Sequence, residues 1–245
     1  MDLGLTGKRA LVTGGSRGIG RAAVLALARE GVHVVAGHRQ HSEAAAGLER
    51  DLKALGGNHR LVAADLSTPE GAAELVAAAG ETLGGIDIIV NNAGAMSQVP
   101  YAQLEQGEWD RLIFTNLTAV HLIVQHALPL LGEGAAIVNI GSGLAMVGMP
   151  GRAHYTASKA GLVGLSRSLA KELGRKGVRV NVIAPGIIET DLAGHLDPAA
   201  RARYESLAAL GRLGRPEDIA NAVLFFAGSL SGFVSGATLP ADGGI

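Results

Sequence analysis

Tyr155 and Lys159 are the two side chains whose types and spacing could do chemistry together. They lie four residues apart at the start of segment 155–174, where apolar residues recur at steps of three and four and predict a helix. Positions i and i+4 share one helix face, so we expect the phenol to lie beside the ammonium. The positive charge would then favour release of the phenol proton.

The size of this effect is sufficient to make a tyrosine a useful proton donor near neutral pH. Free tyrosine titrates near pH ~10, and one pH unit corresponds to about 1.4 kcal/mol, so a pKa near 7 needs roughly 4 kcal/mol. One charge about 4 Å away, at an effective dielectric of about 20, supplies about 4 kcal/mol. The alternative is an exposed helical pair without a role, because Tyr-x-x-x-Lys is a common pattern.

A glycine-rich turn lies between the first predicted strand and the first predicted helix. Its glycines follow the spacing G-x3-G-x-G. Glycines in such a turn let backbone N–H groups and the helix N-terminus approach a pyrophosphate. The alternative is a plain tight turn. The residues expected to bind a dinucleotide here are Gly14, Ser16, Arg17, Gly18, Ile19 and Gly20.

The end of the second predicted strand indicates which dinucleotide is bound. An acidic residue there would bind the ribose hydroxyls and repel a 2′-phosphate, but this chain has His38-Arg39-Gln40. Arg39 and Arg17 together favour NADP(H), and two surface arginines are the alternative. Further cofactor contacts are expected from the residues that follow the third and fourth strands, which are Asp65, Leu66, Asn92, Ala93 and Gly94.

Apolar runs alternate with helical patterns along the whole chain. The candidate strands are segments 8–13, 32–37, 60–64, 86–91, 135–140, 178–183 and 236–240. The main candidate helices are 42–55 with Ser42 as N-cap, a helix starting after Ser67, 103–130, 155–174, and helices after Asp197 and Arg215. This alternation predicts an α/β fold, a single-domain doubly wound Rossmann sheet with parallel strands and helices on both faces.

Composition places limits on the class of protein. The chain has 245 residues, a net charge of −1 and no cysteine, so disulfides and thiolate metal sites are excluded. We expect one domain over 1–245, with a cofactor half of about 1–140 and a catalytic part of about 141–245. Neither a nucleic-acid surface nor a membrane segment is expected, no metal site is expected, and a cytoplasmic location is the default.

The motifs in this order resemble those of the short-chain dehydrogenases/reductases. The resemblance covers essentially the whole chain and rests on TGGSRGIG, Asp65, NNAG, Asn116, Ser142, Tyr155-x-x-x-Lys159 and Pro185-Gly186. Within that family the chain looks most like 3-oxoacyl-[acyl-carrier-protein] reductases and polyketide ketoreductases. It is also similar to glucose and hydroxysteroid dehydrogenases. The resemblance implies a seven-stranded parallel sheet, usually in a homotetramer.

The resemblance also implies roles for individual residues. Tyr155 would be the general acid, Lys159 would depress the tyrosine pKa and bind the nicotinamide ribose, and Ser142 would orient the carbonyl. Asn116 would hold a water that resupplies the proton, with a satisfied core asparagine as the alternative. The remaining expected cofactor contacts are Pro185, Gly186, Ile188 and Thr190.

The substrate is less well specified. Residues of an expected apolar pocket are Ala95, Met96, Leu144, Met149, Ile187 and Ile188, and segment 189–210 matches a mobile substrate loop. His154 is expected at the surface or on the substrate. Carrier-protein reductases commonly have two basic docking positions beside the active-site entrance. Lys176 matches one, but Glu133 stands at the other and would repel an acidic carrier.

The sequence therefore predicts an NADPH-dependent ketone reductase, reversible as a secondary-alcohol dehydrogenase, that acts on a small carbonyl substrate, with a 3-oxoacyl or polyketide-like compound as one candidate. The alternative within enzymes is an NAD(P)-dependent sugar or hydroxysteroid-type alcohol dehydrogenase. The alternative from another class is a non-catalytic nucleotide-sensing protein on the same fold.

Overall fold

The computed structural model describes residues 2–190 and 196–245. A seven-stranded sheet in the order β3-β2-β1-β4-β5-β6-β7 forms its centre, and all six strand pairs are parallel. The order reverses between β1 and β4, where ligands of doubly wound sheets bind. The strands are β1 (Arg9–Val12), β2 (His33–His38), β3 (Arg60–Ala63), β4 (Ile86–Asn91), β5 (Leu131–Ile140), β6 (Arg179–Pro185) and β7 (Thr238–Ala241).

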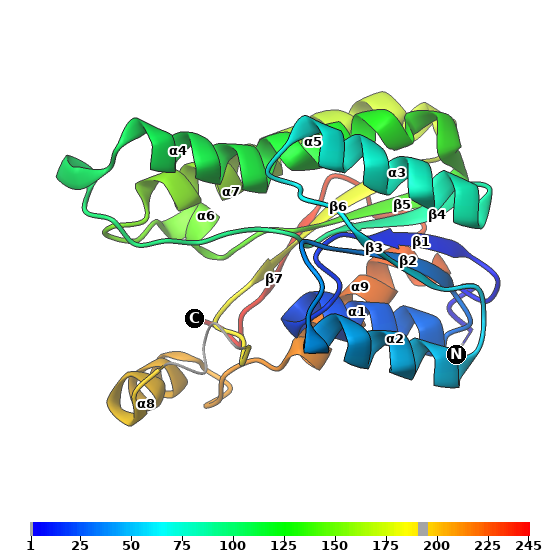
Figure 1. The fold of residues 1–245 in the computed structure, drawn as a ribbon. Helices are drawn as coiled ribbons and strands as arrows, with labels where there is room; N and C mark the ends of the chain where they lie inside the picture. The colour runs from blue at the N-terminus through cyan, green and yellow to red at the C-terminus, as the bar shows by residue number, and fades with distance from the viewer. Residues whose placement is uncertain (1, 191–195) are drawn as a thin grey trace.

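Helices cover both faces of the sheet (Figure 1). One face carries α1 (Gly18–Arg29), α2 (Glu43–Leu55) and α9 (Pro216–Ala227). The other carries α3 (Pro69–Leu83), α5 (Ala119–Ala127) and α7 (Ala153–Leu173), with α4 (Gln106–Ile113) beyond them. The short helix α6 (Leu144–Val147) and α8 (Pro198–Leu207) project past the end of the sheet at which the strands finish.

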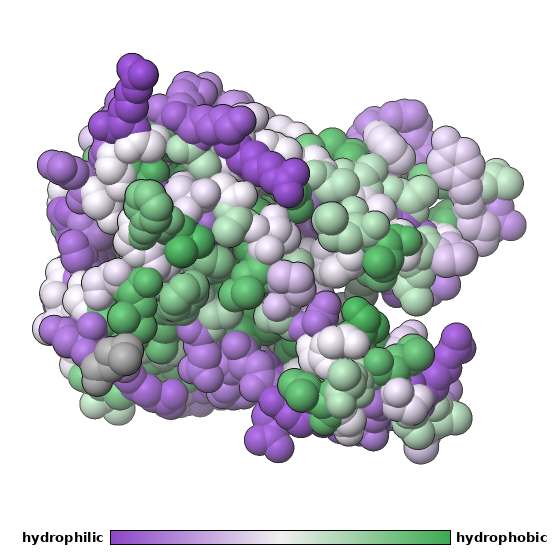
Figure 2. All heavy atoms as spheres, turned by 180° about the vertical axis from the view of Figure 1, so that it is seen from behind, coloured by the Kyte–Doolittle hydropathy of each residue, from purple (hydrophilic) through white to green (hydrophobic). Residues whose placement is uncertain are grey.

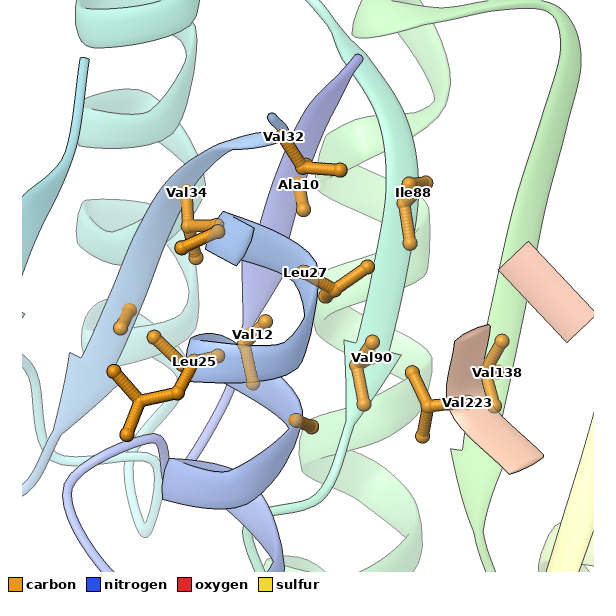
Figure 3. Packing of buried hydrophobic residues seen from close by; sticks show 14 of the residues in the cluster. Ala10, Val12, Leu25, Leu27, Val32, Val34, Ile88, Val90, Val138 and Val223 are labelled. Carbon is orange, nitrogen blue, oxygen red and sulfur yellow. The ribbon is translucent and has the colours of Figure 1, made fainter. Parts of the chain in front are cut away.

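Each face has its own apolar core. In Figure 3, Leu25 and Leu27 of α1 lie over β1, β2 and β4, and Val223 of α9 lies beside Val138 of β5. The second core joins α3, α5 and α7 to the opposite faces of the same strands. Strands buried on both faces explain the continuous apolar runs in the sequence. The site residues that follow the strands are therefore held on a rigid base.

The helix starts use the expected caps. The Ser42 hydroxyl accepts a hydrogen bond from Ala45 N at 3.2 Å, and Thr68 caps α3 through Gly71 N. Asp197 caps α8 through Ala200 N at 2.7 Å. Each side chain satisfies a backbone donor that has no partner inside its helix. The predicted helix starts at these three places are confirmed.

Two sequence predictions need correction. Segment 103–130 is not one α-helix: α4 runs into a π-helical turn, Phe114–Thr118, before α5, and a 3₁₀ turn, Leu128–Leu130, follows. Strand β5 begins at Leu131, four residues before the predicted start at 135, because Leu131 pairs with Ile86 across an irregular register. The other six strands lie where the apolar runs predict them.

Candidate active site

The glycine turn after β1 is shaped to leave the start of α1 open. Gly14 and Gly18 have positive φ angles of 64° and 53°, and a Cβ on Gly20 would lie 2.1 Å from the Gly14 carbonyl oxygen. The N-cap residue of α1, Arg17, makes no side-chain capping bond. The first N–H groups of α1 are thus available to an anion, and the turn fits the pyrophosphate of a dinucleotide.

The loop after β4 is bonded directly to this turn. Asn92 Nδ2 donates to the carbonyl oxygens of Thr13 and Gly14, at 3.1 and 2.9 Å. The Thr13 hydroxyl accepts from the backbone N–H groups of Asn92 and Ala93, both at 3.0 Å. These bonds join the end of β4 to the end of β1. They also bring the NNAG segment and its Gly94 to the same edge as the glycine turn.

The side chains expected to select the cofactor lie at the ends of β1, β2 and β3. Arg17 and Arg39 are exposed, and Asp65 lies within the electrostatic reach of Arg39. The Ser67 backbone N–H and hydroxyl bind the Asp65 carboxylate and hold its pKa below the usual range, with a smaller contribution from Arg39. His38 is buried, and its Nδ1 lies 3.0 Å from the carbonyl oxygen of Gln40. Arg17, after β1, and Arg39, after β2, therefore each present an exposed cation beyond the carboxyl end of their strand.

Lys159 is buried on the inner face of α7. Its ammonium donates to the Ile140 carbonyl oxygen at 2.9 Å, and burial lowers its pKa to about 8. A Cβ on Gly94 would lie 3.0 Å from Asn116 Oδ1 and 3.5 Å from Lys159 Nζ, so Gly94 lies against both side chains. The lysine therefore lies between the ends of β4 and β5.

The pKa of Tyr155 is shifted in the direction opposite to the sequence-based expectation. Burial raises the pKa of the phenol above its ordinary value, while the Ser142 side chain and the positive charge of Arg152 act in the lowering direction. Lys159 is not among the groups that shift this pKa, because its ammonium is directed to the Ile140 carbonyl. The lowering of the tyrosine pKa by Lys159 that the resemblance implies is therefore not found, and burial leaves this pKa above its ordinary value. The phenol keeps its proton at neutral pH.

Ser142 lies at the carboxyl end of β5 in a segment fixed to β6. Gly141 N donates to the Ile183 carbonyl oxygen at 2.7 Å, and Gly143 N donates to that of Pro185 at 3.0 Å. The Ser142 hydroxyl accepts from Leu144 N at 3.2 Å. Because it also affects the Tyr155 pKa, the hydroxyl lies beside the phenol, as the sequence predicts.

Asn116 lies in the π-helical turn and has no exposed surface. Its Oδ1 accepts from Ala95 N at 2.8 Å, and its Nδ2 donates to the Ala95 carbonyl oxygen and to Ser158 Oγ, at 2.9 and 3.0 Å. Such single π turns occur frequently at functional sites. Asn116 therefore ties the loop after β4 to α7, one residue from Lys159.

The segment after β6 passes between the cofactor turn and the last strand. Gly186 N donates to the Ala241 carbonyl oxygen at 3.2 Å, and Ile188 pairs with Gly214 in an isolated bridge. A Cβ on Gly18 would lie 3.2 Å from Thr190 Cγ2, so Thr190 packs on the glycine turn. Part of the expected substrate loop 189–210, residues 191–195, lies outside the described residues.

An apolar hollow lies beyond the end of the sheet. Figure 2 shows it between two projections that carry green, hydrophobic side chains along their walls. The exposed apolar residues of the loop after β4, of α6 and around the end of α8 are Met96, Met146, Val147, Met149, Leu207 and Leu210. Two residues of the predicted apolar pocket, Met96 and Met149, belong to this set. A separate hollow of about 360 Å³ between α1 and α9 is lined by none of Asn116, Ser142, Tyr155 and Lys159.

The two carrier-docking positions lie at the opposite end of the sheet. Glu133 is near the amino end of β5, and Lys176 ends a 3₁₀ turn just before β6. A Cβ on Gly177 would lie 3.2 Å from Glu133 Cγ, so the two segments meet. Since parallel strands separate their amino and carboxyl ends, the expectation that these positions flank the entrance is wrong within a single chain.

His154 is neither at the surface nor on an open pocket wall. It has no exposed area, and its Nε2 lies 2.7 Å from Ser97 Oγ, which is also bonded to Glu108. Arg111 and Ser97 hold the pKa of Glu108 down, at about 2. Sequence reasoning missed this network, which joins α4, the loop after β4 and α7. The only signal was a histidine directly before Tyr155.

Within residues 2–190 and 196–245, no group of three or more His, Cys, Asp or Glu side chains is placed to hold a metal ion. The helical run Gln106–Leu130 is long and apolar enough to cross a membrane by length and composition alone, a test that core helices of soluble proteins also pass. In this fold the run packs through α5 against α3 and the sheet.

Comparisons with known proteins identify relatives that match nearly the whole chain. The family model described as Enoyl-(Acyl carrier protein) reductase matches residues 14–245. L-rhamnose 1-dehydrogenase (NAD(P)(+)) of Azotobacter vinelandii is 39% identical, with 98% of this chain and 97% of that protein covered. The 3-oxoacyl-[acyl-carrier-protein] reductase of Vibrio cholerae is 36% identical, with 99% of each covered. A short chain dehydrogenase from Burkholderia cenocepacia, solved in complex with NADP, is 38% identical over 98% of both chains, with a TM-score of 0.93.

Proposed function

Because the chain belongs to the short-chain dehydrogenase/reductase family, we propose that it is an NADPH-dependent ketone reductase, reversible as a secondary-alcohol dehydrogenase. Members of this family are oxidoreductases that act on CH–OH or keto groups. The observation that carries the proposal is the position of Tyr155, Ser142, Lys159 and Asn116 around the ends of β4 and β5, next to the open glycine turn.

In the proposed reaction the chain's own residues handle the carbonyl oxygen and the proton. Bound NADPH supplies the hydride. Ser142 donates a hydrogen bond to the carbonyl oxygen and holds it beside Tyr155, in the manner of an oxyanion-hole donor. Tyr155 stores the proton, since burial keeps the phenol neutral, and gives it to the oxygen as negative charge develops there.

Lys159 and Asn116 support this transfer. The buried ammonium of Lys159 would hydrogen-bond the nicotinamide ribose of the bound cofactor. With a pKa of about 8, Lys159 is mostly charged at pH 7 yet can exchange a proton near neutrality. Asn116, bonded to Ala95 and Ser158, fixes the loop that lies over the ammonium. We assign to it the positioning of a water that returns a proton to the lysine.

The proposed cofactor contacts place NADP(H) along the carboxyl ends of the strands. The glycine turn would hold the pyrophosphate, Arg17 and Arg39 the 2′-phosphate, and Asp65 the adenine amino group. The bound NADP of the Burkholderia cenocepacia structure supports this choice. The rhamnose dehydrogenase name, which includes both cofactors, supports the rival choice of NAD. Comparing the dissociation constants of NADPH and NADH decides between them, and tighter NADH binding contradicts the proposal.

The substrate class is tested by turnover. A carbonyl panel should contain acetoacetyl thioesters, β-keto esters, steroid ketones and sugar-derived ketones, with Tyr155→Phe as the control. The similarity to 3-oxoacyl reductases favours a 3-oxoacyl-type carbonyl, and the rhamnose dehydrogenase favours a sugar as second candidate. Failure of every carbonyl and every alcohol, with NADPH bound, would leave the nucleotide-sensing alternative.

We also propose that copies of the chain assemble as a homotetramer in the cytoplasm. The outer face of α7 carries small exposed residues, Ala160, Gly164 and Ser168, which let another helix approach closely. The run Gln106–Leu130 beside it has more apolar surface than the fold buries. Pairing of these helices between copies would bury the outer face of α7 and the apolar surface of this run. A monomeric mass in light scattering at micromolar concentration contradicts the assembly.

A further inference from the structure

His154, in the first turn of α7, is a buried polar side chain that the proposed reaction does not use. It has no exposed area, and its Nε2 lies 2.7 Å from Ser97 Oγ in the loop after β4. Its Nδ1 is also buried and has no hydrogen-bond partner within the described part of the chain. Buried polar atoms are nearly always bonded, so a ring held at one nitrogen only needs an explanation. The bond to Ser97 decides what polar role this ring can have.

The hydrogen bonds around His154 run in one direction. Arg111 and Ser97 lower the pKa of Glu108 to about 2, so its carboxylate is ionised and can only accept hydrogen bonds. The one hydroxyl proton of Ser97 is therefore donated to Glu108 Oε1, and the hydroxyl oxygen accepts from His154 Nε2, which carries a proton. Arg111 Nε and Nη2 donate to the two carboxylate oxygens at 2.7 and 2.8 Å. One chain of donors and acceptors thus joins α7, the loop after β4 and α4.

The loop after β4 is bonded to its surroundings at three alternate residues. Ala95 N donates to Asn116 Oδ1 at 2.8 Å. Val99 N donates to the carbonyl oxygen of Gly151, just before α7, also at 2.8 Å. Ser97 is the middle one and is bonded through its hydroxyl. Without that hydroxyl the segment would keep its two end bonds and lose the one between them.

The residues between these bonded positions are exposed. Met96 and Gln98 are exposed, whereas Ala95, Ser97 and Val99 are half-buried. Successive side chains of an extended segment point to opposite sides, so holding the odd-numbered residues inward directs the even-numbered ones outward. Met96 is one of the exposed apolar residues of the hollow beyond the end of the sheet. The bond between Ser97 and His154 therefore affects which side chains of this loop face the hollow.

We propose that Ser97, His154 and Glu108 are positioning residues that hold the loop after β4 as a wall of the substrate site. They act through the side chains that the loop presents, Met96 and Gln98, and none of the three needs to touch the substrate. Since the bonded atoms come from α4, the loop and α7, the wall is fixed to the helix that carries the proton donor.

This inference rests on the proposed ketone reduction and adds to it the residues that place the substrate. The proton donor has a support of its own, because the Tyr155 carbonyl oxygen accepts from Ser158 Oγ at 2.7 Å, and Asn116 bonds Ser158. Breaking the bond between Ser97 and His154 should therefore displace the loop and leave Tyr155 in place. The effect is expected on KM for the ketone rather than on kcat.

The first measurement is hydrogen exchange of the backbone amides of segment 93–100, which needs no substrate. Exchange should be about tenfold faster in Ser97→Ala and in His154→Leu than in wild type, because either change removes the middle bond. His154→Gln should restore the wild-type rate in part, since its side-chain amide can donate to Ser97. Asp110→Asn changes an exposed carboxylate of α4 that accepts from Gln106, and it is the control with wild-type exchange.

The second measurement is NADPH oxidation with a ketone of the carbonyl panel that the wild type reduces. Ser97→Ala and His154→Leu should raise KM about tenfold, with kcat and the dissociation constant for NADPH within about threefold of wild type. His154→Gln should lie between wild type and His154→Leu. The double variant should have the KM of the single ones, because both changes break the same bond.

Two results would overturn the inference. One is unchanged exchange of segment 93–100 in Ser97→Ala, and the other is faster exchange with an unchanged KM, which would make the network a purely structural one. Tyr155→Phe in the same assay tests the proposed function separately, since its loss of turnover does not depend on the loop. A wild type that reduces no ketone contradicts the proposed function, and the exchange rates still decide whether the network holds the loop.

Discussion

The buried ammonium of Lys159 gives a prediction about stability that is independent of any substrate. Its pKa is about 8 in the folded protein and 10.5 in the unfolded reference. Between these values the unfolded chain binds more protons, so the free energy of unfolding rises with pH from about 8 to about 10.5 and is flat below. The difference between these two pKa values corresponds to a free-energy penalty of about 3 kcal/mol for burying the charged ammonium at pH 7.

Lys159→Met removes this penalty. At pH 7 the variant should be more stable than wild type by about 2 kcal/mol, because the loss of the hydrogen bond to Ile140 offsets about 1 kcal/mol of the gain. As the pH rises toward 10, the advantage should shrink and then reverse, since wild-type Lys159 loses its charge. The same variant should have no ketone reductase activity.

The assay is urea unfolding at pH 7, 8, 9 and 10, at one protein concentration so that assembly is held constant. Lys171→Met, which removes an exposed lysine from the same helix, is the matched control. A constant difference between wild type and Lys159→Met over this pH range would refute the reasoning. It would mean that folding does not perturb the titration of Lys159.

Three further substitutions test the cofactor turn, the cofactor choice and the carbonyl contact. Gly20→Ala should abolish tight NADPH binding in a fluorescence titration, because its Cβ would lie 2.1 Å from the Gly14 carbonyl oxygen. As its control, Gly47→Ala in α2 should raise the free energy of unfolding in urea by up to about 1 kcal/mol. Arg39→Asp should weaken NADPH about tenfold relative to NADH, and an unchanged ratio of dissociation constants would remove Arg39 from the phosphate site. Ser142→Ala should lower kcat by about 10²–10³ with little change in NADPH affinity, and wild-type kcat in that variant would exclude the hydroxyl as an oxyanion donor.

The sheet was predictable because its central strands are buried on both faces. Runs such as residues 88–90 (IIV) of β4 are apolar throughout, and glycines or capping residues mark where the neighbouring helices begin. Asn92 and Gly20 were predictable as site residues for a related reason. Gly20 follows β1 and Asn92 follows β4, and the strand order of the sheet reverses between these two strands.

Side-chain direction was not predictable in the same way. The spacing of Tyr155 and Lys159 fixes a shared helix face, but the Ile140 carbonyl, nineteen residues earlier in the chain, determines where the ammonium lies. The π turn at Asn116 has no sequence signal apart from an asparagine in a helix. Arg152 and His154 differ from surface residues only through burial by loops that are distant in sequence.

The most direct test of the proposed function is NADPH oxidation with a ketone substrate from the panel, measured for wild type and for Tyr155→Phe, with NADPH binding measured in parallel. The variant removes only the hydroxyl that stores the proton. We predict that turnover falls by at least about 10³ while the dissociation constant for NADPH stays within about threefold. Wild-type turnover in Tyr155→Phe would contradict the assignment of Tyr155 as the general acid, and with it the proposed mechanism.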